Sequence, residues 1–273
     1  MYINILKQRG IEDSELKVKL IISNILNVDK EYLIIHDNEE IKKELEKAID
    51  LKIFRLFMGE PIQYIINKQE FYALDFYVDK NVLIPQPDTE VLVEEVINIA
   101  KDNKSPKILD LCTGSGAIAI SIKKNIPDAK ITATDISRKA LKVAKINKEK
   151  NNTEIELIKS NMFKKIKDTF DIIVSNPPYI KTKVIKTLDK EVQNEPHIAL
   201  DGGQDGLKFY KIIINQAHEY LKENGFLCLE IGYDQKEEVI NLIKENGNYK
   251  NIYSKKDLAG NDRIIICKIE DKG

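Results

Sequence analysis

The stretch that decides the fold is Lys107-Ile108-Leu109-Asp110-Leu111-Cys112-Thr113-Gly114-Ser115-Gly116-Ala117-Ile118-Ala119. Its first five residues predict a buried strand, and the residues from Ala117 onward predict a helix. Glycine is needed between them because the chain must turn sharply and let its backbone approach a ligand closely. Asp135 ends the next predicted strand, 19 positions beyond Gly116, where a carboxylate can accept hydrogen bonds from ribose hydroxyls. This arrangement predicts a nucleoside-binding loop.

The loop by itself does not fix which nucleoside binds. Gly114-x-Gly116-x-x-Ala119 also satisfies the looser fingerprint of dinucleotide-binding loops, so a nicotinamide-dependent dehydrogenase is one alternative. Asp110, just before the loop, would repel a pyrophosphate and attract an ammonium group. That acid favours S-adenosylmethionine as the cofactor.

Strands and helices alternate on both sides of this loop. The predicted strands are 107–111, 131–135, 155–159, 171–175, 226–231, 250–254 and 263–269. The predicted helices are 89–101, 117–125, 137–149, 207–223 and 235–246. Alternation of this kind is typical of an α/β fold whose parallel sheet binds ligands at the carboxyl ends of its strands. The last two strands have no helix between them, so we expect them to pair antiparallel at one edge.

The chain before this α/β region has a different pattern. Residues 1–63 space their apolar side chains as helices do and end in the breaker Gly59-Glu60-Pro61, which predicts a small helical domain. Residues 64–84 mix aromatic and β-branched side chains, which favours a hairpin linker. We therefore expect a helical domain over 1–63, a linker over 64–84 and a catalytic domain over 85–273.

Composition excludes several classes of protein. The 273 residues are 42% hydrophobic and 32% charged, which indicates a globular chain and not a disordered or fibrous one. No apolar run is long enough for a membrane span and the start does not resemble a signal peptide, so we expect a cytoplasmic protein with no membrane partner. With 43 basic and 44 acidic residues the chain has no charge excess for direct nucleic-acid binding. Cys112, Cys228 and Cys267 have no metal-like spacing, so neither a metal site nor a disulfide is expected.

A second motif, Asn176-Pro177-Pro178-Tyr179, follows the predicted strand 171–175. Two prolines fix two φ values and remove two backbone donors, which holds the groups around Asn176 in one orientation. A substrate NH2 group can donate one hydrogen bond to the Asn176 side-chain oxygen and another to the Pro177 carbonyl, while Tyr179 packs against the flat group. Both protons are then occupied, and the nitrogen lone pair points at a methyl donor. The motif therefore predicts methyl transfer to a planar amide or amine, with these four residues as the catalytic group.

Together the two motifs resemble class I S-adenosylmethionine-dependent methyltransferases, which implies a Rossmann-like sheet of seven strands. Further signatures narrow the resemblance to the release factor glutamine methyltransferase family (HemK/PrmC), and they cover nearly everything from residue 59 onward. In chain order they are Gly59-Glu60-Pro61-Ile62-Gln63-Tyr64-Ile65, Leu83-Ile84-Pro85-Gln86-Pro87-Asp88-Thr89-Glu90, Glu195-Pro196, Gly202-Gly203, Asp205-Gly206-Leu207, Glu230-Ile231-Gly232 and Asp257-Leu258-Ala259-Gly260-Asn261-Asp262-Arg263.

The resemblance implies N5-methylation of the glutamine in the Gly-Gly-Gln motif of class 1 peptide chain release factors. It also implies direct SN2 transfer from S-adenosylmethionine, leaving S-adenosylhomocysteine, and a helical N-terminal domain that helps dock the release factor. The implied cofactor-binding residues are Asp110, Cys112, Thr113, Gly114, Ser115, Gly116, Ala117, Asp135 at the ribose, Met162 at the adenine, and Asn176. Two positions depart from the family pattern. Gln86 replaces the usual arginine, and Met162 replaces the usual aromatic, where a thioether can still pack with less stacking.

Three alternatives stay open at this point. An adenine-N6 methyltransferase of DNA or RNA would present the same planar amine to the Asn176–Tyr179 motif, but it would need a basic groove or a target-recognition domain, and neither is visible in the sequence. A dehydrogenase would need a hydride-transfer constellation, which does not accompany the glycine loop. A non-catalytic module that binds a translation factor would not need the intact Asn176–Tyr179 motif.

Overall fold

The computed structural model of this chain describes residues 2–36 and 39–270. The described chain divides into two compact units. The first runs to Lys68 and also takes in Asp189–Asn194, and the second comprises Gln69–Leu188 and the chain from Glu195 onward. The predicted linker 64–84 is thus shared between the units. Residues 1 and 37–38 of the predicted helical domain and residues 271–273 of the predicted catalytic domain lie outside the described residues.

The first unit is helical, as its apolar spacing predicts. Its helices are α1 (Tyr2–Gln8), α2 (Ser14–Leu26), α3 (Lys30–Ile35), α4 (Lys43–Phe57), α5 (Ile62–Ile66) and the short α10 (Lys190–Gln193). Leu6, Val18, Ile21, Ile49, Ile53, Leu56, Ile62 and Ile65 form its buried core. Segment 189–194, distant in sequence, is held by a 2.7 Å ion pair between Lys17 and Glu191 and by a 2.9 Å hydrogen bond from Asn194 Nδ2 to the Gly59 carbonyl. No local pattern in the sequence indicated that this segment belongs to the helical unit.

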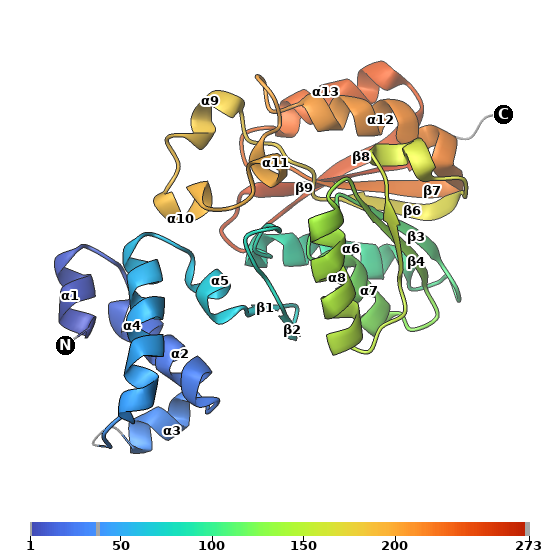
Figure 1. Cartoon of the computed structure of the whole chain (residues 1–273). Helices are drawn as coiled ribbons and strands as arrows, with labels where there is room; N and C mark the ends of the chain where they lie inside the picture. The colour runs from blue at the N-terminus through green and yellow to red at the C-terminus, as the bar shows by residue number, and fades with distance from the viewer. Residues whose placement is uncertain (1, 37–38, 271–273) are drawn as a thin grey trace. The chain divides into compact units, whose positions relative to one another are not determined.

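The second unit is built on a twisted sheet (Figure 1). Within the described residues its strands are β3 (Lys107–Leu111), β4 (Lys130–Asp135), β5 (Glu156–Lys159), β6 (Phe170–Ser175), β7 (Leu221–Glu230), β8 (Tyr249–Lys256) and β9 (Asp262–Ile269). They lie in the order β5-β4-β3-β6-β7-β9-β8. Neighbours from β5 to β7 are parallel, whereas β9 is antiparallel to both β7 and β8. The prediction of a seven-stranded Rossmann-like sheet with a final antiparallel pair is confirmed.

Helices cover both faces of this sheet (Figure 1). The helices α6 (Glu90–Ala100), α7 (Ala117–Asn125) and α8 (Arg138–Lys150) lie on one side, and α12 (Lys208–Tyr220) and α13 (Lys236–Asn246) lie on the other. Strand β9 shows the alternation that results: Ile264 and Ile266 pack into the core beside α6 and α7, whereas Ile265 and Cys267 pack into the core beside α12 and α13. Because both faces are buried, strands near the centre of the sheet carry runs of consecutive buried apolar residues, such as Ile172-Ile173-Val174 in β6.

Short elements outside the seven-stranded sheet complete the unit. A hairpin of β1 (Gln69–Phe71) and β2 (Leu74–Phe76) occupies part of the predicted linker, and its two phenylalanine rings join the core beside α6 and α7. The sequence did not predict η1 (Pro87–Thr89), η2 (Met162–Lys165), α9 (Thr182–Ile185) or α11 (His197–Leu200). Helix α12 ends at Tyr220, three residues before the predicted end, because β7 already begins at Leu221. Over residues 2–36 and 39–270, no helix has the length and apolarity needed to cross a membrane.

Gly116 fixes the approach of α7 to α8, and this can be tested against a matched glycine. Gly116 (φ 82°) and Gly247 (φ 75°) both have left-handed backbone, but only at Gly116 would an added Cβ meet neighbours, at 3.1 Å from Ile120 Cδ1 and 3.3 Å from Ala144 Cβ. We expect Gly247→Ala to lower the free energy of unfolding by about 1 kcal/mol through backbone strain alone. We expect Gly116→Ala to cost about 1–3 kcal/mol more through overpacking. Urea unfolding followed by circular dichroism measures both values, and equal losses would contradict the packing argument.

Candidate active site

A cavity of about 360 Å³ opens at the carboxyl ends of β3, β4 and β6. This volume lies within the range of roughly 300–1,000 Å³ that is typical of small-molecule sites. The chain leaves β3 to form strands on one side and returns to form β6 on the other, which is where doubly wound sheets bind their ligands. The cavity wall brings together the predicted site residues Cys112, Gly114, Asp135, Met162, Asn176 and Pro178.

The glycine loop after β3 is fastened to the end of β4. Cys112, Gly114 and Gly116 all have positive φ values, of 60°, 55° and 82°. The Gly114 N–H donates to Asp135 Oδ2 at 3.0 Å, and the Ser137 N–H donates to Asp135 Oδ1 at 2.7 Å. The Asp135 carboxylate is therefore fixed in orientation and still has lone pairs for a ligand. Its pKa is raised, chiefly because it is buried, and the backbone hydrogen bonds oppose that rise.

Asp110 lies beneath the loop instead of on the cavity wall. Its side chain is fully buried, and its Oδ2 accepts a 2.5 Å hydrogen bond from the Thr113 hydroxyl. Oδ1 has no hydrogen-bond partner among the described residues. Burial raises the pKa of Asp110 to about 7, although the Thr113 hydrogen bond opposes this. A buried carboxyl group with an unsatisfied oxygen is costly, and a bound cation would offset that cost.

The remaining predicted cofactor residues shape the loop from behind. Thr113, Ser115, Gly116 and Ala117 are buried and do not line the cavity. The Ser115 carbonyl accepts a 2.9 Å hydrogen bond from Asn147 Nδ2 in α8. These four residues therefore hold the loop in place, whereas Cys112 and Gly114 present its backbone to the cavity.

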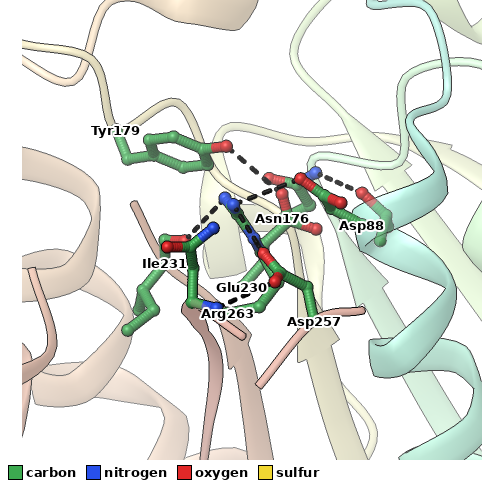
Figure 2. Close-up of polar contacts among 9 residues, drawn as sticks. Asp88, Asn176, Tyr179, Glu230, Ile231, Asp257 and Arg263 are labelled. Carbon is green, nitrogen blue, oxygen red and sulfur yellow. Dashed lines mark hydrogen bonds and ion pairs between the residues drawn. The ribbon is translucent and has the colours of Figure 1, made fainter. Parts of the chain in front are cut away.

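In the second motif, Asn176 lines the cavity and its Nδ2 donates to Thr89 Oγ1 at 3.3 Å. Because the side-chain amide is planar, Oδ1 is then directed away from Thr89. Figure 2 shows Asn176 together with the polar residues around it. Just before the motif, the Ser175 hydroxyl donates to the Leu111 carbonyl at 2.8 Å and ties the end of β6 to the end of β3.

The backbone after the motif is clamped on both sides. Ile180 donates to the Leu200 carbonyl at 2.9 Å and accepts from the Gly202 N–H at 2.8 Å. Gln235 Nε2 donates to the Tyr179 carbonyl at 3.0 Å. A Cβ at Gly202 would lie only 2.7 Å from Tyr179 Cα, so glycine is required for this close approach. The loop is consequently rigid at the place where a substrate amide is expected.

Pro177 and Tyr179 are absent from the residues that line the cavity. The Tyr179 hydroxyl donates to Glu230 Oε1 at 3.3 Å, and burial raises the pKa of Tyr179 above its ordinary value. The expected contact between the Tyr179 ring and a flat substrate group therefore stays a prediction.

Sequence reasoning missed several residues of the cavity wall. Phe209 and Ile212 reach it from α12, and Ile136 follows Asp135. The spacing of three between Phe209 and Ile212 places both on one face of the predicted helix, and this signal could have identified them. Glu195, from one of the sequence signatures, accepts a 2.9 Å hydrogen bond from the Ile84 N–H through Oε2 and so supports the segment that enters the cavity wall. Gln86 is exposed, and its Nε2 donates to the Ile84 carbonyl at 3.1 Å.

A buried polar cluster adjoins the second motif (Figure 2). Its centre is Arg263 of β9, whose guanidinium group lies 2.9 Å from Asp257 Oδ2 and 3.1 Å from Asp88 Oδ2. Arg263 Nη1 also donates to the Ile231 carbonyl at 3.4 Å. Glu230, at the end of β7, is buried within the same cluster. The cluster joins η1, the end of β7 and the turn between β8 and β9 behind Asn176.

Comparison with known proteins agrees with this architecture. Residues 86–194 match the methyltransferase small domain, and residues 2–66 match the PrmC N-terminal domain. Among solved structures, a methyltransferase from Pyrococcus furiosus has a TM-score of 0.53 at 22% identity, and the match covers 80% of this chain and 98% of that chain. This structural similarity supports the assignment of a methyltransferase-like fold.

Two relatives have higher sequence identity. The release factor glutamine methyltransferase of Fusobacterium nucleatum is 42% identical over 268 residues, which cover 96% of this chain and 75% of the relative. A protein of the same name from Clostridium acetobutylicum is 40% identical, and the match covers 94% of this chain and 90% of the relative. Because these matches span both the helical unit and the sheet with its two motifs, the chain belongs to the release factor glutamine methyltransferase family.

Proposed function

We propose that this protein transfers a methyl group from S-adenosylmethionine to the side-chain nitrogen, N5, of the glutamine in the Gly-Gly-Gln motif of class 1 peptide chain release factors. The observation that carries the proposal is the position of Asn176, which shares one cavity with Gly114 and Asp135. An acceptor for a planar NH2 group thus lies beside a nucleoside-binding loop. The names of the relatives supply the substrate, since both are release factor glutamine methyltransferases.

The residues of the cavity fit the proposed cofactor, which supplies an electrophilic methyl group when bound. The Asp135 carboxylate would accept the ribose hydroxyls, and Ile136 and Met162 would offer apolar surface to the adenine. Of the segment Cys112–Ala117, the backbone of Cys112 and Gly114 would hold the methionine part, and the other four residues would support the loop from behind. Asp110 would balance its ammonium group, because Asp110 Oδ1 is a buried acceptor that has no hydrogen-bond partner within residues 2–36 and 39–270.

Asn176 and Pro177 would orient the substrate amide. The Asn176 Oδ1 and the Pro177 carbonyl would each accept one N–H of the glutamine NH2 group, which leaves the nitrogen lone pair free to attack. A resonance-stabilised amide is a poor nucleophile, so positioning and exclusion of water must lower the barrier. The amide nitrogen would take the methyl group as the methyl–sulfur bond breaks, which leaves the thioether S-adenosylhomocysteine, and the N-methylated amide would lose one of its two protons to water. The rigid backbone around Tyr179 keeps these acceptors in place.

The helical N-terminal unit is proposed to dock the release factor, and the catalytic unit to carry out the transfer. The reaction would take place in the cytoplasm, where release factors act, and would need no direct contact between this chain and nucleic acid. Adenine-N6 methylation remains the outcome to exclude by experiment, because a flipped adenine offers the same planar amine.

The proposed substrate can be tested by incubating the protein with labelled S-adenosylmethionine and an intact class 1 release factor, followed by peptide mass spectrometry. We expect one added methyl group on the Gly-Gly-Gln glutamine and none on a factor that carries Gln→Ala at that position. A DNA oligomer and an RNA oligomer serve as competing substrates. Label on either nucleic acid, with none on the factor, would overturn the substrate assignment and retain the chemistry.

Asn176→Ala removes the proposed amide acceptor. We expect turnover to fall on the order of 100-fold, because one preorganised polar contact to the reacting group is lost. Cofactor affinity, measured by calorimetry, should change little. Asn215→Ala, at an exposed position of α12, is the matched control and should leave turnover unchanged. Near-normal turnover of Asn176→Ala would rule out the proposed role of this residue.

Asp110→Asn tests the proposed ammonium partner. Burial raises the pKa of Asp110 to about 7 in the folded protein, so the wild-type protein without cofactor should lose stability as pH rises from about 4 through 7. The asparagine in Asp110→Asn does not titrate. The free energy of unfolding of this variant, relative to that of wild type, should therefore increase between pH 5 and pH 8 in urea unfolding. Its affinity for S-adenosylmethionine should fall about tenfold or more, because a hydrogen bond to a charged group is lost. A stability difference that is independent of pH would contradict this account.

A further inference from the structure

We infer that Asn147 of α8 is a positioning residue for the cofactor. Its side-chain amide joins the glycine loop to the chain segment 77–83 and so sets the spacing between two parts of the cavity wall. The inference rests on the proposed function, because that function assigns the cavity to S-adenosylmethionine. It goes beyond the proposed function, because Asn147 is fully buried and can act only through the backbone that it holds.

Asn147 occupies a position where the pattern of α8 predicts an apolar residue. The buried residues of this helix are Ala140, Val143, Ala144 and Asn147, which have the spacing of one helix face. Asparagine is a weaker helix former than alanine or leucine. A buried amide is also unfavourable unless it is hydrogen-bonded. The polar end of this buried face therefore requires partners from other parts of the fold.

The Asn147 amide has three backbone partners in two distant segments. Nδ2 donates to the Tyr77 carbonyl and to the Ser115 carbonyl, in both cases at 2.9 Å, and Oδ1 accepts from the Tyr77 N–H at 2.6 Å. Both hydrogens of the NH2 group are used. A reversed amide would place its oxygen against two carbonyls, so these partners fix its orientation. One side chain thus connects α8 with residues 70 and 32 positions away in the sequence.

On the Ser115 side, the contact holds the glycine loop from behind. Ser115 is buried and directly follows Gly114, which lines the cavity. The Gly114 N–H donates to Asp135 Oδ2 at 3.0 Å, so the loop is fastened at one point by Asp135 and at the next residue by Asn147. The position of the loop backbone, which would hold the methionine part of the cofactor, depends on both contacts.

On the Tyr77 side, the contact holds the start of a tight turn that leads to the cavity wall at residues 81–83. Asp79 Oδ1 accepts from the Asn81 N–H at 2.9 Å, and the Asp79 carbonyl accepts from the Val82 N–H at 3.2 Å. These bonds make the turn a unit. A displacement of the Tyr77 backbone would therefore move residues 81–83 with it.

The two contacts arrange the cavity before the cofactor binds. A site whose walls already have the correct spacing loses less conformational entropy on binding than a site that must be ordered by its ligand. Without the Asn147 amide, the glycine loop and the turn would no longer share a common support. The affinity for S-adenosylmethionine should therefore depend on Asn147, whereas turnover at saturating cofactor should depend on it much less.

Asn151, one turn later in α8, offers a matched control. Its Nδ2 donates to the Asp75 carbonyl and to the Asn147 backbone carbonyl, both at 3.1 Å. Asn151 thus also joins α8 to the chain before Tyr77, but neither of these partners belongs to the glycine loop or to residues 81–83. Asn151→Ala measures the effect of a weakened contact at the end of α8 by itself.

The test compares wild type, Asn147→Ala and Asn151→Ala. Calorimetry gives the Kd for S-adenosylmethionine, steady-state kinetics give kcat and the KM of each substrate, and urea unfolding gives stability. Asn147→Ala should raise the Kd and the KM for S-adenosylmethionine about tenfold, through the loss of preorganisation. Its kcat at saturating cofactor and its KM for the release factor should change little. Asn151→Ala should lower the urea midpoint and leave the cofactor Kd at the wild-type value.

The split between cofactor affinity and turnover separates positioning from structural support. A lower kcat or urea midpoint in Asn147→Ala, with the cofactor Kd of the folded protein unchanged, would overturn the inference. An equal rise of the Kd in Asn151→Ala would also overturn it. If Asn147→Ala does not fold, Asn147→Ser is the second variant, because its hydroxyl and a water molecule can bond the exposed backbone groups. Asn147→Ser should raise the Kd by a smaller factor, and a wild-type Kd would contradict the inference.

Cofactor binding is measured without a release factor, so the two proposals can fail separately. A wild-type protein that binds S-adenosylmethionine more tightly than Asn147→Ala does, but methylates no release factor, would refute the proposed substrate and keep the role of Asn147. Methylation of the release factor with equal cofactor affinities in both proteins would refute the role of Asn147 and keep the function. A wild-type protein that does not bind S-adenosylmethionine would refute both.

Discussion

The parallel pairing of β3 with β6 is the constraint on which the functional arrangement depends. Leu111 pairs with Ser175 at the last position of both strands, and the Ser175 hydroxyl donates to the Leu111 carbonyl at 2.8 Å. The next residues along the chain are Cys112 and Asn176, which begin the glycine loop and the second motif. Because these residues leave neighbouring strand ends in the same direction, the two motifs open into one cavity. Without this register, the nucleoside-binding loop and the amide acceptor would be unrelated features of one sheet.

Buried acids near the cavity indicate where the fold gives up stability for function. Asp110 and Glu230 are both buried, both have one oxygen without a hydrogen-bond partner among the described residues, and both have a pKa raised to about 7. Burying a carboxyl group with an oxygen that lacks a hydrogen-bond partner is unfavourable. The burial of these two acids is therefore not explained by stability alone. Strongly perturbed acids of this kind cluster at functional sites. Here one lies behind each motif, Asp110 beneath the glycine loop and Glu230 behind Asn176.

The chain passes from the catalytic unit to the helical unit and back after the second motif. After the second motif the chain leaves the catalytic unit at Leu188, contributes Asp189–Asn194 to the helical unit and returns at Glu195. Glu195 then holds the backbone of Ile84 at 2.9 Å, next to the residues that form one side of the cavity wall. Ile198 and Ala199, which follow Glu195 along the chain, line the cavity.

The sequence by itself determined where the seven strands of the sheet and its main helices lie along the chain, and it identified the two motifs. Apolar periodicity and the geometry of glycine and proline are properties of a few neighbouring residues, so they can be recognised without the fold. Asp135 and Asn176 were placed correctly at strand ends for this reason. Only the tertiary structure decided that segment 189–194 packs in the helical unit, that Phe209 lines the cavity, and that Asn176 donates to Thr89. These relations join residues that are far apart in the chain. They arise from the order of the strands within the sheet and from the packing of helices, which no local pattern encodes.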